Sequence, residues 1–276
     1  MMFKNLVPVS LKEKLKASFI SFAEKMNRRA YQMHYLPHEC TVCGAKVLEF
    51  KPFVEFQLYQ KYRFKFSIFA LETFNFTQYH CPFCKANDRD RLYALYLKER
   101  FAKLDKNKKY NFIDFAPETL SLRAFVKSQP FLNYRTADLY MQGVDDQVDL
   151  QDMHIYQDSS TDMFICSHML EHVPDDLKAM RELYRILKPG GFGIAMVPIQ
   201  LDIEEIYENP AITSGEERWT HFGQDTHLRV YSKKGWLQRL QSVGFKVEQL
   251  GAAHFGEANF EKYGIYPSSI LYVVSK

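Results

Sequence analysis

Residues 164–175 read FICSHMLEHVPD, and residues 183–191 read LYRILKPGG. The apolar start of the first stretch predicts a buried strand over 163–166. The residues after it predict a helix over 175–187, which Pro189, Gly190 and Gly191 end. A second apolar run predicts another strand over 192–197. A strand, a helix and a strand in this order are typical of a parallel sheet that is covered by helices.

The same alternation extends from residue 108 to the end of the chain. Apolar runs predict further strands over 111–115, 134–138, 148–150, 245–250 and 270–275. Periodic apolar residues predict further helices over 119–128 and 233–243. The expected fold class is therefore α/β, with a doubly wound parallel sheet.

Four cysteines form two Cys-x-x-Cys pairs ahead of this region, Cys40 with Cys43 and Cys81 with Cys84. Two such pairs supply four thiolates, which complete a tetrahedral shell around one zinc ion. A closed shell leaves no position for substrate, so we expect a structural Zn²⁺ site; iron accepts the same ligands. The fifth cysteine, Cys166, lies in an apolar run and is expected in the core.

The segment between the two cysteine pairs is rich in aromatic residues. Alternating side chains predict strands over 54–58 and 64–68, and a helix is expected over 90–101. We therefore divide the chain into an N-terminal helix over 1–36, a four-cysteine zinc-binding module over 37–104 and an α/β domain over 105–276.

Residues 10–31 predict an amphipathic helix that begins at a capping box formed by Ser10 and Glu13. Its polar face is basic. Two interpretations stay open: a helix packed on its own protein with a solvated face, or a peripheral contact with a membrane or a protein partner.

The chain has 276 residues, 46% of them hydrophobic, and a formal net charge of +3. This charge is too small to indicate nucleic-acid binding, and the composition is that of a globular protein. Its apolar runs are shorter than a membrane-spanning helix, and its N-terminus lacks the pattern of a signal peptide. The expected location is cytoplasmic, where thiols stay reduced.

The stretches 164–175 and 183–191 closely resemble the fourth strand, the following helix and the turn of class I S-adenosylmethionine-dependent methyltransferases of the type 11 branch. Residues 227–245 resemble that branch's segment before the sixth strand. The resemblance covers about residues 110–276. It implies a seven-stranded Rossmann-like sheet whose last strand runs antiparallel, and S-adenosylmethionine as cofactor.

The resemblance also assigns roles along the carboxyl edge of the sheet. Asp114 matches an acid that helps to hold the methionine moiety, and Asp138, followed by Leu139, matches the acid that binds the ribose. Asp152 and Met153 match the pair that flanks the adenine. Ser167 and His168 match the loop beside the methionine moiety.

The first loop departs from the family pattern. Related proteins carry a Gly-x-Gly-x-Gly run there, which lets the backbone approach the cofactor. This chain has Phe115, Ala116, Pro117 and Glu118 instead, and so resembles a subgroup with a Phe-Ala-Pro-Glu loop. Two interpretations follow: a loop in which Glu118 meets the cofactor, or a domain that no longer binds it.

Two polar clusters supply candidates for chemistry. The first combines His168, Glu171 and His172, and the second lies in a stretch that could close over the site and contains His221, Asp225, His227 and Arg229. A hydroxyl acceptor must lose a proton, and histidine suits that role near neutral pH. We therefore take His168, His172 and His227 as candidate catalytic residues. Some family members that resemble this block bind a divalent ion through the positions of the first cluster, although one position here is His where they have an acid.

The leading hypothesis is O-methylation of a sugar, a glycan or another small polar acceptor. One alternative is an RNA methyltransferase, since zinc modules precede some of these domains. The other is a non-catalytic scaffold that binds a partner. The sequence leaves the oligomeric state open.

Overall fold

The computed structural model describes residues 36–117 and 119–276. The predicted helix over 10–31 and the loop residue Glu118 lie outside the described residues. Among the helices of the described ranges, none has the length and apolar character needed to cross a membrane.

A seven-stranded sheet forms the centre of the molecule, in the order β10-β11-β7-β6-β3-β4-β5. Its strands are β3 (Tyr110–Phe115), β4 (Leu132–Asp138), β5 (Asp146–Gln147), β6 (Thr161–Ser167), β7 (Leu187–Met196), β10 (Lys246–Leu250) and β11 (Leu271–Ser275). The strands from β7 to β5 run parallel, whereas β11 is antiparallel to both β7 and β10. The predicted sheet, including its antiparallel last strand, is confirmed.

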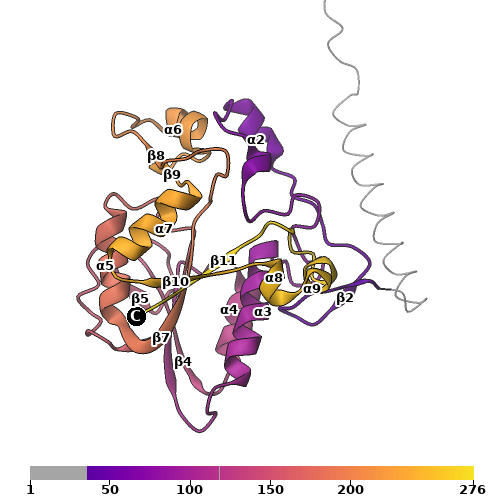
Figure 1. The fold of residues 1–276 in the computed structure, drawn as a ribbon, viewed down its shortest axis with the longest axis vertical. Coiled ribbons are helices and arrows are strands. Elements are labelled where there is room, and N and C mark those ends of the chain that lie inside the picture. The colour runs from indigo at the N-terminus through magenta and orange to yellow at the C-terminus, as the bar shows by residue number, and fades with distance from the viewer. Residues whose placement is uncertain (1–35, 118) are drawn as a thin grey trace, which may run out of the picture.

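Helices cover both faces of this sheet, as the predicted doubly wound fold requires (Figure 1). Those that flank the strands are α3 (Asp88–Ala102), α4 (Leu120–Lys127), α5 (Asp176–Ile186) and α7 (Lys233–Ser242). Helices α5 and α7 lie on one side, and α3 and α4 on the other. The apolar periodicity therefore located these helices to within two residues.

Two local predictions on this sheet were wrong. The strand expected over 148–150 lies earlier, at β5, and Val148 and Leu150 are buried in the turn after it. Strand β7 begins directly after α5, so the Pro-Gly-Gly run expected to separate helix and strand lies within the strand's bounds. Local periodicity does not show whether an apolar residue is buried without pairing to a strand, or whether a strand includes a turn sequence.

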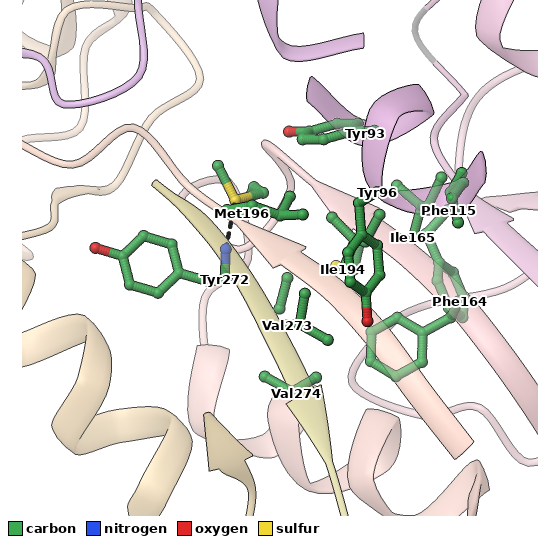
Figure 2. Packing of buried hydrophobic residues seen from close by; sticks show 14 of the residues in the cluster. Tyr93, Tyr96, Phe115, Phe164, Ile165, Ile194, Met196, Tyr272, Val273 and Val274 are labelled. Carbon is green, nitrogen blue, oxygen red and sulfur yellow. Dashed lines mark hydrogen bonds between the residues drawn. The ribbon is translucent and has the colours of Figure 1, made fainter. Parts of the chain in front are cut away.

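Helix α3 joins the cysteine pairs to the sheet. It begins at a capping box in which Asn87 and Asp90 each accept the other's backbone N–H. The ring of Tyr96 in α3 packs edge to face with the ring of Phe192 in β7, and the two ring centroids are 5.5 Å apart. Figure 2 shows Tyr96 above the strands, near the hydrogen bond from the Tyr272 N–H to the Met196 sulfur. The helix predicted over 90–101 is confirmed and belongs to the same core as the sheet.

The segment between the cysteine pairs differs from the prediction. In place of strands over 54–58 and 64–68 it forms helix α2 (Phe56–Lys61) and a 3₁₀ turn (Ile68–Ala70). Its aromatic rings pack on one another, as in the edge contact of Phe53 with Phe74 at 4.9 Å. Within the described part of the chain, residues 48–80 form only single β-bridges, such as that of Leu71 with Gln200, so the alternating side chains pack as rings without a strand ladder.

Two segments close over the carboxyl edge of the sheet, and we call them the roof: residues 53–79, with α2, and residues 215–223, with α6 (Gly215–Phe222). Figure 1 shows α2 and α6 near one another above the sheet. The Lys65 N–H donates to the Thr220 carbonyl at 2.8 Å, and Tyr62 stacks on Trp219 at 5.1 Å. Neither helix was predicted from the sequence.

The remaining elements are short. They are β1 (His38–Glu39), β2 (Lys46–Val47), β8 (Tyr207–Glu208), β9 (Arg229–Val230), α8 (Ala252–Phe255) and α9 (Glu257–Lys262). The β8–β9 pair supports α6, and β1–β2 carries the first cysteine pair.

Candidate active site and metal centres

The structure brings Cys40, Cys43, Cys81 and Cys84 together, with every Sγ within 4.8 Å of the others. The Cys40–Cys84 and Cys43–Cys81 sulfurs are 3.7 and 3.9 Å apart. A tetrahedron with Zn–S bonds of about 2.3 Å has edges of about 3.8 Å, so the spacing fits a tetrathiolate metal site. Cys166 is fully buried in β6, as expected, and burial raises the pKa of its thiol.

The loop after β3 contains a residue in the left-handed backbone region that glycine favours. Ala116 has φ of +48°, in the left-handed region that side chains with a Cβ adopt at a cost. Its N–H donates to the Ala137 carbonyl of β4 at 2.8 Å, which holds the turn in place. Phe115 is buried and Pro117 half-buried. The loop therefore has the conformation of a glycine turn without the glycine.

Asp114 lies one residue before the end of β3 and is 3% exposed. Its Oδ2 accepts the Tyr134 hydroxyl at 2.7 Å. Burial raises the pKa of Asp114 to about 7, which that hydrogen bond opposes. Because the pKa of this carboxyl group lies near neutral pH, a positive charge nearby would favour its ionised form.

Further along the same edge, Asp138 ends β4. Its Oδ1 accepts the N–H groups of Tyr140 and Met141 at 2.7 and 2.6 Å, so the loop fixes this carboxylate. Leu139 and Tyr140 are exposed beside it, which leaves an apolar surface at the carboxyl edge.

The predicted adenine pair lies after β5. Asp152 is exposed and Met153 fully buried. The Met153 N–H donates to Glu182 of α5 at 2.8 Å, and its carbonyl accepts from Arg185 at 2.9 Å. This turn is therefore held rigidly against α5, whereas the Asp152 side chain faces solvent.

The loop after β6 carries Ser167 and His168. The Ser167 hydroxyl lies 2.8 Å from the Tyr93 hydroxyl of α3. His168 has φ of +55°, and its Nε2 lies 2.8 Å from a guanidinium nitrogen of Arg89. Its Nδ1 is 3.5 Å from Oε1 of the buried Glu171. Burial, and next the Arg89 charge, lower the pKa of His168 well below its usual value, so the ring is neutral.

Glu171, His172 and His227 lie close together, although His227 is far from His172 in the sequence. One ligand atom from each lies within 4.8 Å of the others. The imidazole rings meet edge to face at 4.6 Å. His227 Nδ1 lies 3.1 Å from the Phe222 carbonyl, so it carries the hydrogen and Nε2 keeps a lone pair. Burial lowers the pKa of His227 to about 3.

Glu171, His172 and His227 line a cavity of about 550 Å³ beneath the roof, whereas Asp114, Asp138, Asp152 and Met153 are not among its lining residues. One wall is aromatic and comes mainly from the roof. Its rings are Phe53, Tyr59, Phe64, Phe74, Tyr79, Trp219 and Phe222. The opposite wall is polar and comes from the loops after β3 and β6 and from the segment before β9. It contains Ser167, His168, Glu171, His172, Asp225 and His227.

Of the second predicted cluster, Asp225, His227 and Arg229 line this cavity and His221 does not. Arg229 is 6% exposed and donates to the carbonyls of Leu170, Val173 and Pro174, so it pins the loop after β6. His221 lies 2.7 Å from the Tyr207 hydroxyl in the β8–α6 cluster. Asp225 is exposed at the cavity rim.

A scan against protein-family models matches residues 86–250 to a family described as "Methyltransferase domain". The match covers more than half of the 276 residues. The chain belongs to this methyltransferase family. Membership of this family implies S-adenosylmethionine as the methyl donor. The matched region begins two residues before α3, so the helix that follows the second cysteine pair is part of it.

Known proteins resemble the methyltransferase over parts of their length. Demethylmenaquinone methyltransferase of Alkalihalophilus pseudofirmus is 26% identical over 114 residues, which are 41% of this chain and 47% of the relative. The chain thus matches about half the length of that curated relative.

Solved structures similar to the methyltransferase include an Archaeoglobus fulgidus S-adenosylmethionine-dependent methyltransferase. It is 13% identical, with 69% of this chain and 95% of that chain covered and a TM-score of 0.42. A chain in the Haloferax volcanii complex of the Trm112 methyltransferase activator with a putative methyltransferase is 18% identical. The match covers 68% of this chain and 93% of that chain, and the TM-score is 0.41.

Neither the aromatic wall nor the role of Arg89 was predicted from the sequence. The aromatic residues were noticed as a composition, but only the folded roof turns them toward the polar loops. Arg89 lies within the Asn87–Asp90 capping box, which starts α3 and is a signal that the sequence contains. That signal gives the helix start, whereas the direction of the guanidinium depends on how α3 meets β6.

Proposed function

We propose that this methyltransferase transfers the methyl group of S-adenosylmethionine to a hydroxyl of a small polar acceptor, such as a sugar or glycan. The observation that carries this proposal is the two-walled cavity: aromatic rings face histidines and carboxylates. Aromatic rings pack on the apolar face of a sugar ring, while polar groups bind its hydroxyls. In this proposal the roof selects the acceptor, and the loops after β3 and β6 face the donor.

The cofactor assignments fit the places of their residues along the sheet. In parallel sheets ligands bind past the carboxyl ends of the strands. We propose that Asp138 takes the ribose hydroxyls, that Leu139, Asp152 and Met153 flank the adenine, and that Asp114 attracts the cofactor's ammonium group. Phe115, Ala116, Pro117 and Glu118 would form the loop beneath it, and Ser167 and His168 the opposite side.

A calorimetric titration with S-adenosylmethionine tests this site. Asp138→Ala should weaken binding about 10-fold or more, because the loop-held carboxylate accepts hydrogen bonds from the ribose. Asp105→Ala, in an exposed turn away from this edge, is the matched control. An unchanged affinity in Asp138→Ala would show that the site is misplaced, and no binding by the native chain would contradict the proposed function.

The acceptor's proton requires a base, and the hydrogen bonds of the three candidates differ. His168 uses the lone pair of Nε2 to accept from Arg89, so it is better placed to position that loop. His172 and His227 each have a ring nitrogen within 4.8 Å of the other and of a Glu171 carboxylate oxygen. We therefore assign proton transfer to His172 or His227 and positioning to His168.

The same three residues, Glu171, His172 and His227, also fit a divalent ion. Two imidazoles and one carboxylate form a ligand set for first-row divalent metals, and His227 is oriented by a carbonyl behind it, as metal-bound histidines are. When bound, the ion would lower the pKa of a coordinated hydroxyl. Titration with Mn²⁺ should show one site that His227→Ala removes. His254→Ala, at an exposed histidine far from the cavity, should keep it.

We propose that the cysteine cluster binds zinc and that the chain divides into residues 1–36, a zinc module over 37–104 and a methyltransferase domain over 105–276, with α3 packed on both parts. Elemental analysis should find one zinc, not iron, per chain. Cys81→Ser should lower the metal content to near zero and reduce the melting temperature, since structural zinc contributes directly to folding. Full retention of metal would contradict the assignment.

The acceptor class has its own test. Methyl transfer from labelled cofactor to a panel of saccharides should exceed transfer to structured RNA. Transfer to RNA alone would favour the RNA alternative. Cofactor binding without transfer to either would favour the scaffold, and the net charge of +3 gives no support to RNA.

A further inference from the structure

Arg89 places a positive charge inside the cavity from an element that lies outside the α/β domain as the sequence divides it. It lies in the first turn of α3, is 6% exposed and lines the cavity with Ala116 and Ser167. One guanidinium nitrogen lies 2.8 Å from Nε2 of His168. The charge therefore lies beside the loop after β6, in a cavity that Ala116 of the loop after β3 also lines.

The proposed cofactor brings a carboxylate to this place. Its methionine end carries an ammonium and a carboxylate, and a carboxylate taken out of water needs a cation or several N–H donors. Asp114 can attract the ammonium group but would repel the carboxylate. The second charge therefore requires a partner of its own.

Of the described residues that line the cavity, two carry a permanent positive charge, Arg89 and Arg229. Arg229 is directed away, because its guanidinium donates to Leu170, Val173, Pro174 and Glu208. Arg89 is the cation beside the loop after β6, where His168 lies 2.8 Å from its guanidinium. Its planar fork of N–H groups matches a carboxylate in two parallel hydrogen bonds.

We propose that Arg89 binds the carboxylate of the cofactor's methionine moiety. The inference rests on the proposed use of S-adenosylmethionine at this edge of the sheet. It gives the cysteine cluster a part in cofactor binding. The cluster clamps the start of α3, since the Cys81 N–H donates to the Ala86 carbonyl and the Thr41 hydroxyl to the Arg91 carbonyl.

The experiment compares two ligands that differ only in this carboxylate, S-adenosylhomocysteine and decarboxylated S-adenosylhomocysteine. By calorimetry, the native chain should bind the first about 10- to 100-fold more tightly. Arg89→Met should weaken binding of the first by a similar factor and leave the second nearly unchanged, so that the two affinities become equal. Lys98→Met, which removes an exposed charge from the same helix, should behave as the native chain.

Structure is checked by zinc content and circular dichroism for every variant. If Arg89→Met does not fold, Arg89→Lys keeps the charge without the fork and should show a reduced preference for the carboxylate. The proposal is overturned if the native chain binds both ligands equally, or if either Arg89 variant keeps the full native preference. A native chain that binds neither ligand would instead contradict the proposed function.

Discussion

Ala116 has a left-handed backbone conformation in the loop that lacks the glycines expected there. Its φ of +48° costs about 1 kcal/mol for a residue with a Cβ. We expect Ala116→Gly to keep the affinity for S-adenosylmethionine and to leave unfolding stability unchanged or raised by up to about 1 kcal/mol. Urea denaturation and calorimetry measure both.

Ala124 provides the control for this substitution. It is exposed in the middle of α4, where glycine costs about 1 kcal/mol. Ala124→Gly should therefore lower stability. If Ala116→Gly is as destabilising as Ala124→Gly, the loop does not hold the left-handed conformation.

Asp114 makes stability depend on pH. Its pKa is about 7 in the folded chain and near 3.8 when exposed, so the folded state holds a proton that the unfolded state releases. The free energy of unfolding should therefore fall as pH rises from about 4 to about 7, by roughly 4 kcal/mol from this group.

Asp114→Asn removes this contribution while its side-chain oxygen can still accept from Tyr134. The stability of the variant relative to the native chain should rise between pH 4 and 7 and then level off, as measured by urea denaturation at fixed ionic strength. A difference that does not vary with pH would show that Asp114 has an ordinary pKa in the folded state.

The two halves of the roof, α2 and α6, hold each other through few contacts. Trp219 stacks on Tyr62 and meets Tyr59 edge to face at 6.1 Å. Trp219→Ala should cost about 1–2 kcal/mol of local stability. Amide exchange at Lys65, whose N–H crosses between the halves, should then become about 5- to 30-fold faster.

The core should be unaffected by this change, because neither Trp219 nor Tyr62 belongs to the main hydrophobic cluster. Exchange in β3 and β6 is the internal control, and Tyr140→Ala, at an exposed aromatic residue outside the roof, is the control variant. Uniformly faster exchange across the sheet would show that the roof does not open as a unit.

Arg91 connects the two ends of the described chain. Its guanidinium is fully buried and donates to the carbonyls of Tyr79 and Ala86 beside the second cysteine pair, and to those of Tyr263 and Gly264 after α9. Arg91→Met should leave these carbonyls without donors and destabilise the protein by about 3–5 kcal/mol.

Thermal unfolding and zinc content measure this effect together. Lysine cannot reproduce a planar fork, so Arg91→Lys should rescue little. Arg100→Met, at the other end of α3 where the guanidinium stacks on Phe192, should cost much less. A small loss in Arg91→Met would show that the cysteine module is held mainly by other contacts.

The sequence by itself determined the sheet with its helices and the cysteine cluster. These features depend on local patterns: strands and helices follow apolar periodicity, and Cys-x-x-Cys brings two thiolates to one ion whatever surrounds it. The order of acids along the carboxyl edge followed from the strand ends. Asp138 and its neighbours could therefore be assigned to this edge of the sheet without knowledge of distant contacts.

The tertiary structure alone decided the cavity. His172 meets His227, Arg89 meets His168, and the aromatic segment expected as strands became a roof, all through contacts between residues far apart in the chain. Such contacts depend on how α3 and α6 pack over the sheet, which periodicity within one segment does not encode. The local pattern therefore predicted which fold would form, and the long-range packing decided which side chains face one another in it.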